Sequence, residues 1–149
     1  FEVPAAMGAQ VGRPRETVWS IAGDGGFQMT MSELATIAEN KIPVKIAIIN
    51  NNSLGMVRQW QELFYKKNYF ASVYSGNPDF VKLAEAFGIL GLRAQHKKEV
   101  EPVIVKAMEH QGPVVIDFRV EPEENVYPMI PSGTSVAEMI EEPRRVAVR

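Results

Sequence analysis

Two short polar segments contain the residue types that can hold a metal ion together with a phosphate group. Gly23-Asp24-Gly25-Gly26 directly follows a β-rich apolar run, and Asn50-Asn51-Asn52-Ser53 directly follows another. Carboxylate and amide oxygens are hard donors, which suit Mg²⁺ or Ca²⁺ better than zinc. The neighbouring glycines let the backbone turn sharply and approach a ligand closely. The side chains of Asp24 and Asn51, with a backbone carbonyl near Ser53, could therefore supply three oxygens to one ion. Taken alone, Gly23–Gly26 also fits a strand-to-helix turn that carries a solvated aspartate.

The elements that would position these segments alternate between strands and helices. Runs of strand-like and helical residues in alternation indicate βαβ units, and hence a parallel sheet covered by helices on both faces. In such a sheet, ligands bind beyond the carboxyl ends of the strands. If the first two strands are neighbours, Asp24 and Asn51 lie at the same edge. The predicted fold class is α/β, a three-layer parallel sheet flanked by helices. We expect strands over 17–22, 44–49, 89–94 and 113–120, and helices over 4–11, 30–39, 56–64, 77–87, 99–109 and 135–140.

Capping signals predict where two of these helices begin. Thr30 followed by Glu33 fits a capping box, which gives Glu33 a structural role. Asn77-Pro78 fits an N-cap followed by proline at the first helical position.

Several conspicuous side chains have a structural interpretation beside a functional one. Met56, Trp60 and Phe64 recur at helical spacing. We expect Phe64 to pack in the core. Trp60, one turn beyond the metal loop, is expected to line a pocket. Arg58 is expected to be a solvated charge, and Asn52 to face solvent or to cap its turn. The two histidines, His96 and His110, and the pair Lys66-Lys67 are expected to be structural or exposed.

Composition excludes several functional classes. The chain has 149 residues, 46% of them hydrophobic, and a formal net charge of −2 at pH 7, which lacks the basic excess of a nucleic-acid binder. With no cysteine, thiolate catalysis, disulfides and Cys-ligated zinc are excluded. No apolar run approaches the roughly 20 residues of a membrane span, and no secretory signal is visible, so we expect a cytoplasmic protein. We expect one domain over 1–149, with a C-terminal closing segment and tail over 126–149. Because the chain starts at Phe1, we expect it to be a piece of a longer polypeptide.

The spacing of the two polar segments resembles a known cofactor signature. Gly23-Asp24-Gly25, then residues 26–49, then Asn50-Asn51 resembles the thiamin-diphosphate signature, GDG and NN separated by about two dozen residues. The run LGMVRQWQELF over 54–64 is similar to the GMVxQWQxLF segment of acetolactate (acetohydroxyacid) synthase catalytic subunits. The segments NPDF over 77–80, LAEAFG over 83–88 and PMIPSG over 128–133 are similar to that family too. The chain thus resembles the C-terminal, diphosphate-binding domain of a three-domain subunit.

The resemblance implies roles for particular residues. Asp24 and Asn51 correspond to the side-chain ligands of Mg²⁺, and Ser53 corresponds to a residue that ligates through its main-chain carbonyl. The residues implied to bind thiamin diphosphate are Gly23, Asp24, Gly25, Gly26, Asn51, Ser53, Leu54, Gly55 and Met56. Those implied to form the substrate pocket are Met56, Val57, Trp60, Ser132 and Gly133.

The family also implies an activity that this chain does not carry alone. Acetolactate synthases decarboxylate pyruvate and condense the product with pyruvate or 2-ketobutyrate, in branched-chain amino acid biosynthesis. The activating glutamate is expected in an N-terminal domain of a partner subunit, and most of the FAD site in a middle domain. The resemblance therefore implies a homodimer or tetramer, a possible regulatory small subunit, and no turnover by this chain alone.

Three alternatives remain open. The first is another thiamin-diphosphate 2-keto acid decarboxylase or carboligase, acting on pyruvate, benzoylformate or oxalyl-CoA, which the segment 56–64 disfavours. The second is that the isolated chain is a non-catalytic cofactor-binding module. The third is a nucleotide-binding α/β domain, which predicts a GxGxxG or GxxxxGK[ST] loop that does not follow the first strand.

Overall fold

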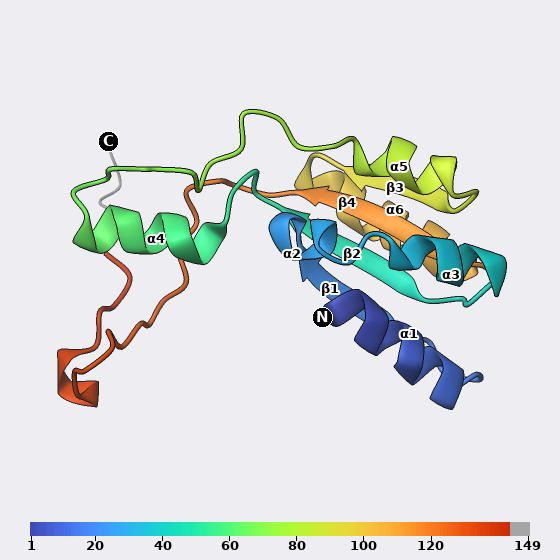
Figure 1. The fold of residues 1–149 in the computed structure, drawn as a ribbon, viewed down its shortest axis with the longest axis horizontal. Helices are drawn as coiled ribbons and strands as arrows, with labels where there is room; N and C mark the ends of the chain where they lie inside the picture. Colours follow the sequence, from blue (N-terminus) through green and yellow to red (C-terminus); the bar gives the residue numbers. More distant parts are fainter. Residues whose placement is uncertain (144–149) are drawn as a thin grey trace.

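Four parallel strands form a single sheet in the order β1-β2-β4-β3 (Figure 1). The computed structural model describes residues 1–143. Strand β2 lies between β1 and β4, and β4 lies between β2 and β3, so the two central strands are the second and the fourth in sequence order. The strand bounds are β1 (Trp19–Gly23), β2 (Lys45–Asn50), β3 (Leu90–Ala94) and β4 (Val114–Arg119).

Helices lie on both faces of the sheet, which confirms the predicted three-layer α/β fold. One face packs against four helices, and the other packs against α6 alone. The sixth helix, α4, lies beyond the carboxyl ends of the strands (Figure 1). The helix bounds are α1 (Glu2–Gly12), α2 (Asp24–Gln28), α3 (Glu33–Glu39), α4 (Gly55–Phe64), α5 (Phe80–Ala86) and α6 (Lys97–Glu109). No helix within residues 1–143 combines the length and apolarity that crossing a bilayer requires.

The main core lies under α1, α2, α3 and α5. Ile46 and Ile48 point to this face from the central strand β2 and are fully buried. Phe27 of α2 and Phe80 of α5 meet edge to face above them, with ring centroids 5.4 Å apart. Alternate residues of a strand point to opposite faces, so the unbroken apolar run of β2 requires cover on both sides.

The second face is covered over β3 and β4 and partly open over β1. Leu92, Val114 and Ile116 pack against Ala107 of α6. On β1, however, Ile21 is 63% exposed. A groove of about 840 Å³ runs along this face between β1 and α6.

Two predicted helix starts are wrong. Helix α3 begins at Glu33 after Ser32, and the Thr30 hydroxyl is buried with no hydrogen-bond partner among the described residues. Helix α5 begins at Phe80, and its N-cap is Asp79, whose carboxylate accepts the backbone N–H groups of residues 81 and 82. An aspartate directly before the helix supplies the acceptor that the N-cap position requires. Asn77 is therefore left to make other contacts.

The C-terminal segment has little regular structure. After β4 the chain passes α4, turns back on itself away from the helix and returns towards it (Figure 1). Met129 and Ile140 pair through two backbone hydrogen bonds of 2.9 and 2.8 Å. The helix predicted over 135–140 is a single 3₁₀ turn, Val136–Glu138, capped by Ser135 and Glu138. The last part of the predicted segment 126–149, beyond residue 143, lies outside the described residues.

Candidate functional site

The sheet register brings the two polar segments to one edge, as predicted. Gly23 at the end of β1 is the partner of Ile49 in β2, so Asp24 and Asn50 occupy the next positions on neighbouring parallel strands. Beyond these strand ends lies a groove of about 380 Å³. Its lining contains every residue predicted to bind the cofactor: Gly23, Asp24, Gly25, Gly26, Asn51, Ser53, Leu54, Gly55 and Met56, together with Ile49 and Val57.

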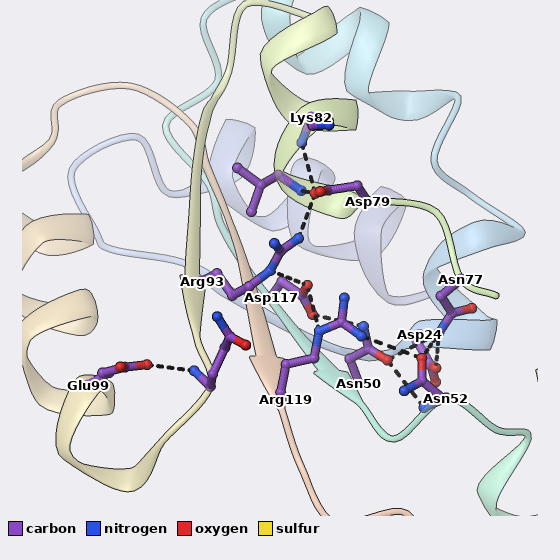
Figure 2. A network of polar contacts seen from close by, with 12 residues as sticks. Asp24, Asn50, Asn52, Asn77, Asp79, Lys82, Arg93, Glu99, Asp117 and Arg119 are labelled. Atoms are coloured by element: carbon purple, nitrogen blue, oxygen red, sulfur yellow. Dashed lines mark hydrogen bonds and ion pairs between the residues drawn. The ribbon is translucent and has the colours of Figure 1, made fainter.

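Asp24 is a buried carboxylate on this groove. Its side chain is 1% exposed, and Asn77 donates a hydrogen bond of 2.6 Å from its Nδ2 to the Oδ2 of Asp24 (Figure 2). Burial raises the pKa of Asp24, while hydrogen bonds from Asn77 and from the backbone N–H groups of Gly25 and Asn52 oppose that shift. Among the described residues, no cationic side chain forms an ion pair with Asp24. A cation bound beside this carboxylate would supply the missing positive charge.

The loop after β2 is held in a fixed shape by local hydrogen bonds. The backbone N–H of Ser53 donates to Oδ1 of Asn51 (3.1 Å), and the carbonyl of Asn52 accepts from the N–H of Tyr74 (2.9 Å). Asn52 has φ +55°, in the left-handed region that asparagine tolerates better than most residues. The Ser53 hydroxyl is buried and has no hydrogen-bond partner among the described residues. A buried polar group without a partner is rare, and a ligand oxygen in the groove could satisfy it.

The glycine turn after β1 has little space for side chains. A Cβ at Gly25 would lie 2.5 Å from the Tyr74 hydroxyl and 2.8 Å from Cδ2 of Leu54. The phenol of Tyr74 thus covers this turn, close to Asp24. Burial and the negative charge of Asp24 both raise the pKa of Tyr74. Gly25 is therefore required for the backbone to reach the groove.

The donor set fits a hard divalent cation that is shared with a phosphate group. Within residues 1–143, no three His, Cys, Asp or Glu side chains come together in a way that could hold a metal. The site instead combines the carboxylate of Asp24, the amide of Asn51 and main-chain oxygens. Magnesium accepts such oxygens and usually completes its shell with water and ligand phosphate oxygens.

A second groove of about 580 Å³ adjoins the first along α4. Met56 and Val57 line both grooves, and Trp60 lines the second. The Trp60 and Phe64 rings meet edge to face, with centroids 5.8 Å apart. Phe64 is 43% exposed, so its predicted place in the core is wrong. The reason is that α4 does not pack on the sheet, and its apolar face borders a groove instead.

Two glutamines attach α4 to the chain segments on either side. The Gln59 side chain, 1% exposed, donates from Nε2 to the carbonyl of Val126 (2.9 Å), and its Oε1 accepts the N–H of Val126 (2.8 Å). Gln61 forms the same reciprocal pair with Phe70, at 2.9 and 3.3 Å. Each side-chain amide thus pairs with the N–H and the C=O of one residue, as the backbone of a neighbouring β-strand would. These two contacts connect α4 to the C-terminal segment and to the loop 65–79.

Arg58 is buried rather than solvated, contrary to the prediction. Its side chain pairs with Glu62 at 3.2 Å, lies 5.1 Å from the centre of the Tyr69 ring, and approaches Asn125 at 3.5 Å. The C-terminal segment covers the guanidinium. The sequence of the helix alone does not reveal this contact. Arg58 is a structural cation at this junction.

Ser132 and Gly133 are the two predicted pocket residues that the structure does not bring to either groove. Both are exposed, and Gly133 has φ +83° in a turn near the end of the C-terminal segment. Their role in the pocket stays a prediction. His96, His110, Lys66 and Lys67 are exposed as expected, and His96 caps α6.

Sequence reasoning missed three residues at this site: Asn77, Tyr74 and Gln59. Asn77 and Tyr74 lie on the loop 65–79 between α4 and α5. A loop of this length without regular structure is often functional, and that signal was available from the sequence. No local sequence signal marks Gln59, whose partner is 67 residues away.

A parallel α/β sheet with an acid and an amide at adjacent strand ends, above a glycine turn, has the arrangement of α/β domains that bind ligands at the carboxyl ends of their strands. Comparison with known families specifies the ligand. Residues 1–118 match the family described as "Thiamine pyrophosphate enzyme, C-terminal TPP binding domain". The chain belongs to this family.

Individual relatives agree with this membership. The chain is 52% identical over 140 residues to an acetolactate synthase of Mycobacterium avium, 49% over 141 residues to an acetolactate synthase large subunit of Porphyra purpurea, and 44% over 141 residues to the acetolactate synthase isozyme 2 large subunit of Escherichia coli (strain K12). These matches cover 91%, 94% and 95% of this chain, but 22%, 24% and 26% of the relatives. The chain thus spans about a quarter of the length of the curated relatives it matches.

A solved structure shares the fold. The thiamine diphosphate-dependent 4-hydroxybenzoylformate decarboxylase of Rhodococcus jostii RHA1 is similar with a TM-score of 0.75 and 29% sequence identity, over 83% of this chain and 23% of that chain. The predicted resemblance to the thiamin-diphosphate domain of acetolactate synthase large subunits is confirmed.

Proposed function

We propose that this chain binds thiamin diphosphate through Mg²⁺ and is the cofactor-binding domain of an acetolactate synthase. The observation that carries the proposal is the placement of Asp24 and Asn51 on one groove at the ends of neighbouring strands. Identity of 44–52% to acetolactate synthases over most of this chain supports the choice of enzyme within the family.

Each part of the groove has a role in this proposal. Asp24 and Asn51 ligate Mg²⁺ through their side chains, and Ser53 ligates through its main-chain carbonyl. Gly25 and Gly26 present backbone to the diphosphate, because neither carries a side chain that would block it. The bound cofactor supplies the electron sink for decarboxylation of a 2-keto acid. The chain's own contribution is to bind the cofactor, orient it and exclude water from it.

The second groove is proposed to select the second 2-keto acid. Met56, Val57 and Trp60 form an apolar wall next to the cofactor groove. Pyruvate and 2-ketobutyrate differ by one methylene, for which an apolar pocket discriminates by about 1–3 kcal/mol. We expect Trp60→Leu to change the ratio of products formed from the two acids and to leave decarboxylation of the first pyruvate nearly unchanged. An unchanged product ratio would count against Trp60 as a wall of the pocket.

The remaining features of the whole enzyme extend beyond this chain. Because the chain spans about a quarter of its relatives, FAD, the activating glutamate and any regulatory subunit are proposed to belong to other parts of the protein or to partners. We propose a cytoplasmic homodimer or tetramer that acts in branched-chain amino acid biosynthesis. By itself the chain is expected not to turn over.

The test is to replace Asp24 in the intact protein. Removal of an outer-shell partner costs about 10–100-fold in metal affinity, so loss of a direct anionic ligand in Asp24→Ala is expected to cost more. Isothermal titration of thiamin diphosphate in the presence of Mg²⁺ measures the affinity. Glu39→Ala, an exposed acid on α3, is the matched control and should bind normally. If Asp24→Ala binds the cofactor as tightly as the parent, the assignment is wrong.

The alternative enzyme class is another thiamin-diphosphate decarboxylase. Its support is the structural similarity to the 4-hydroxybenzoylformate decarboxylase. A product assay on the intact protein with pyruvate distinguishes the two classes. Acetolactate supports the first proposal, whereas free aldehyde supports the alternative.

A further inference from the structure

Asn77 contacts three polar side chains at the carboxyl ends of β1 and β2 at once, and one of them, Asp24, lines the cofactor groove. Its Nδ2 lies 2.6 Å from Oδ2 of Asp24, 3.1 Å from Oδ1 of Asn50 and 3.1 Å from Oδ1 of Asn52 (Figure 2). All three partners are acceptors, so the amide nitrogen, with its two hydrogens, must face them. Asn77 therefore joins the ends of β1 and β2 from a loop outside the sheet.

The opposite side of the Asn77 amide is fixed as well. Gln28 of α2 donates from Nε2 to Oδ1 of Asn77 (3.2 Å) and to the carbonyl of Asp24 (3.2 Å). A donor on the oxygen and acceptors on the nitrogen define one orientation of the amide. Within residues 1–143, Asn77 is the side chain that donates a hydrogen bond to the Asp24 carboxylate.

A buried ion cluster holds this arrangement from the other end. Asn50 donates from Nδ2 to Oδ1 of Asp117 (2.8 Å), and this bond leaves its Oδ1 to accept from Asn77. Asp117 is fully buried, and its Oδ2 accepts 3.0 Å bonds from Nε of both Arg93 and Arg119. Figure 2 shows the series of side chains that connects these arginines to Asp24. A buried network in which each group has a partner is rigid, because any rotation leaves a polar group unpaired.

The position of Asn77 does not follow from capping of α5. Asp79 supplies the cap, and it also pairs with Arg93 at 2.5 Å. The Asn77 side chain could therefore face solvent without cost to the helix. Its contacts instead converge on the carboxylate that faces the groove.

We propose that Asn77 is a positioning residue of the cofactor site. It holds Oδ2 of Asp24 and so fixes the orientation in which this carboxylate meets the cation, while Asn50 and Asp117 keep Asn77 itself in place. The inference rests on the proposed function, because it concerns the affinity of the same site for a divalent ion.

The experiment measures metal binding directly in the intact protein. Mn²⁺ replaces Mg²⁺, and its free concentration in the presence of thiamin diphosphate is followed by electron paramagnetic resonance. Loss of one hydrogen bond to a charged group is expected to weaken Mn²⁺ binding about 10- to 100-fold in Asn77→Ala. The kcat at saturating metal and cofactor is expected to stay within about threefold of the parent, because Asn77 contacts the ligand residue and not the reacting atoms.

Matched variants separate the possible outcomes. Asn40→Ala removes an exposed asparagine at the end of α3 and should bind Mn²⁺ normally. Asn77→Ser is used if Asn77→Ala does not fold. The serine hydroxyl lies one bond closer to the backbone than the asparagine amide nitrogen, so this variant is also expected to weaken Mn²⁺ binding. Unchanged Mn²⁺ affinity, or a lower kcat at unchanged affinity, overturns the positioning role. Asp24→Ala is run in parallel: if it too leaves Mn²⁺ binding intact, the proposed function fails as well.

Discussion

Replacing Gln59 with alanine should release the C-terminal segment from α4 while the other side of the helix stays in place. Gln59 attaches this segment through its reciprocal pair with Val126. Gln61, two residues further along the same helix, makes the equivalent pair with Phe70 on the loop 65–79. The two glutamines are therefore matched probes of two different attachments.

The expected magnitude follows from the bonds that are lost. Each amide hydrogen bond contributes about 1 kcal/mol net, so Gln59→Ala removes about 2 kcal/mol from the attachment. Val126 is 63% exposed, and its freed backbone groups can bind water, so no large desolvation penalty adds to this figure. A change of about 2 kcal/mol corresponds to a roughly 30-fold larger population of the detached segment.

Hydrogen–deuterium exchange of the intact protein measures this population. In Gln59→Ala, we expect exchange of peptides within 126–140 to rise about 30-fold. Exchange of peptides within 65–74 should stay unchanged. Gln61→Ala should give the reverse pattern. If both segments respond equally to each substitution, or if neither responds, the two amides are not the attachments that we infer.

Three further predictions concern the carboxylates of Asp24, Asp79 and Asp117. Burial raises the pKa of Asp24, so protonation favours folding and the charged form costs stability at neutral pH. Without ligands, the melting temperature of Asp24→Asn at pH 7 should thus equal or exceed that of the parent. This difference in melting temperature should shrink as acid neutralises the parent carboxyl. A lower melting temperature of the variant in calorimetry would contradict the reasoning. The pKa of Asp79 is lowered, because hydrogen bonds from Lys82 N–H and Arg93 outweigh burial. Its capping contribution to the stability of α5 is about 1 kcal/mol, which Asp79→Ala should remove. This contribution should be present above the ordinary aspartate pKa and disappear as the pH falls below that value. Amide exchange of α5 between pH 6 and 3 measures it. Asp117→Asn should lower the free energy of unfolding by about 3 kcal/mol in urea titrations, since it removes the fully buried negative charge that both Arg93 and Arg119 contact, and a loss below about 1 kcal/mol would contradict this.

The order of the strands along the chain and the location of the site could be predicted from the sequence, whereas the short helix α2 (Asp24–Gln28) was not. Apolar runs such as 44–49 identify strands, and the polar residues directly after them mark the carboxyl edge where ligands bind. The register of β1 and β2 confirms that Asp24 and Asn51 meet at this edge. This part was predictable because it depends on periodicity and on the general geometry of parallel sheets.

Other features depend on contacts that no local pattern encodes. Phe64 has the spacing of a core residue, but α4 projects beyond the sheet, so its ring packs on Trp60 and stays partly exposed. Arg58 has the spacing of a surface residue, but the segment near Asn125 covers it. Asn77 has the signature of an N-cap, but Asp79 lies two residues closer to the helix. In each case a partner distant in sequence, or a competing neighbour, determined the outcome.

The central position of β4 has a consequence for how the molecule is made. The strand is formed by residues Val114–Arg119, yet it pairs with both β2 and β3. The ribosome must therefore deliver β1, β2 and β3 before the inner edge of β2 finds its partner. Until then, the hydrogen-bonding groups of a strongly apolar strand stay open to pairing with other nascent chains. Translation that stalls shortly before the codon of Val114 should therefore yield products that aggregate and depend on chaperones, whereas synthesis past Arg119 lets β4 pair with β2 and β3.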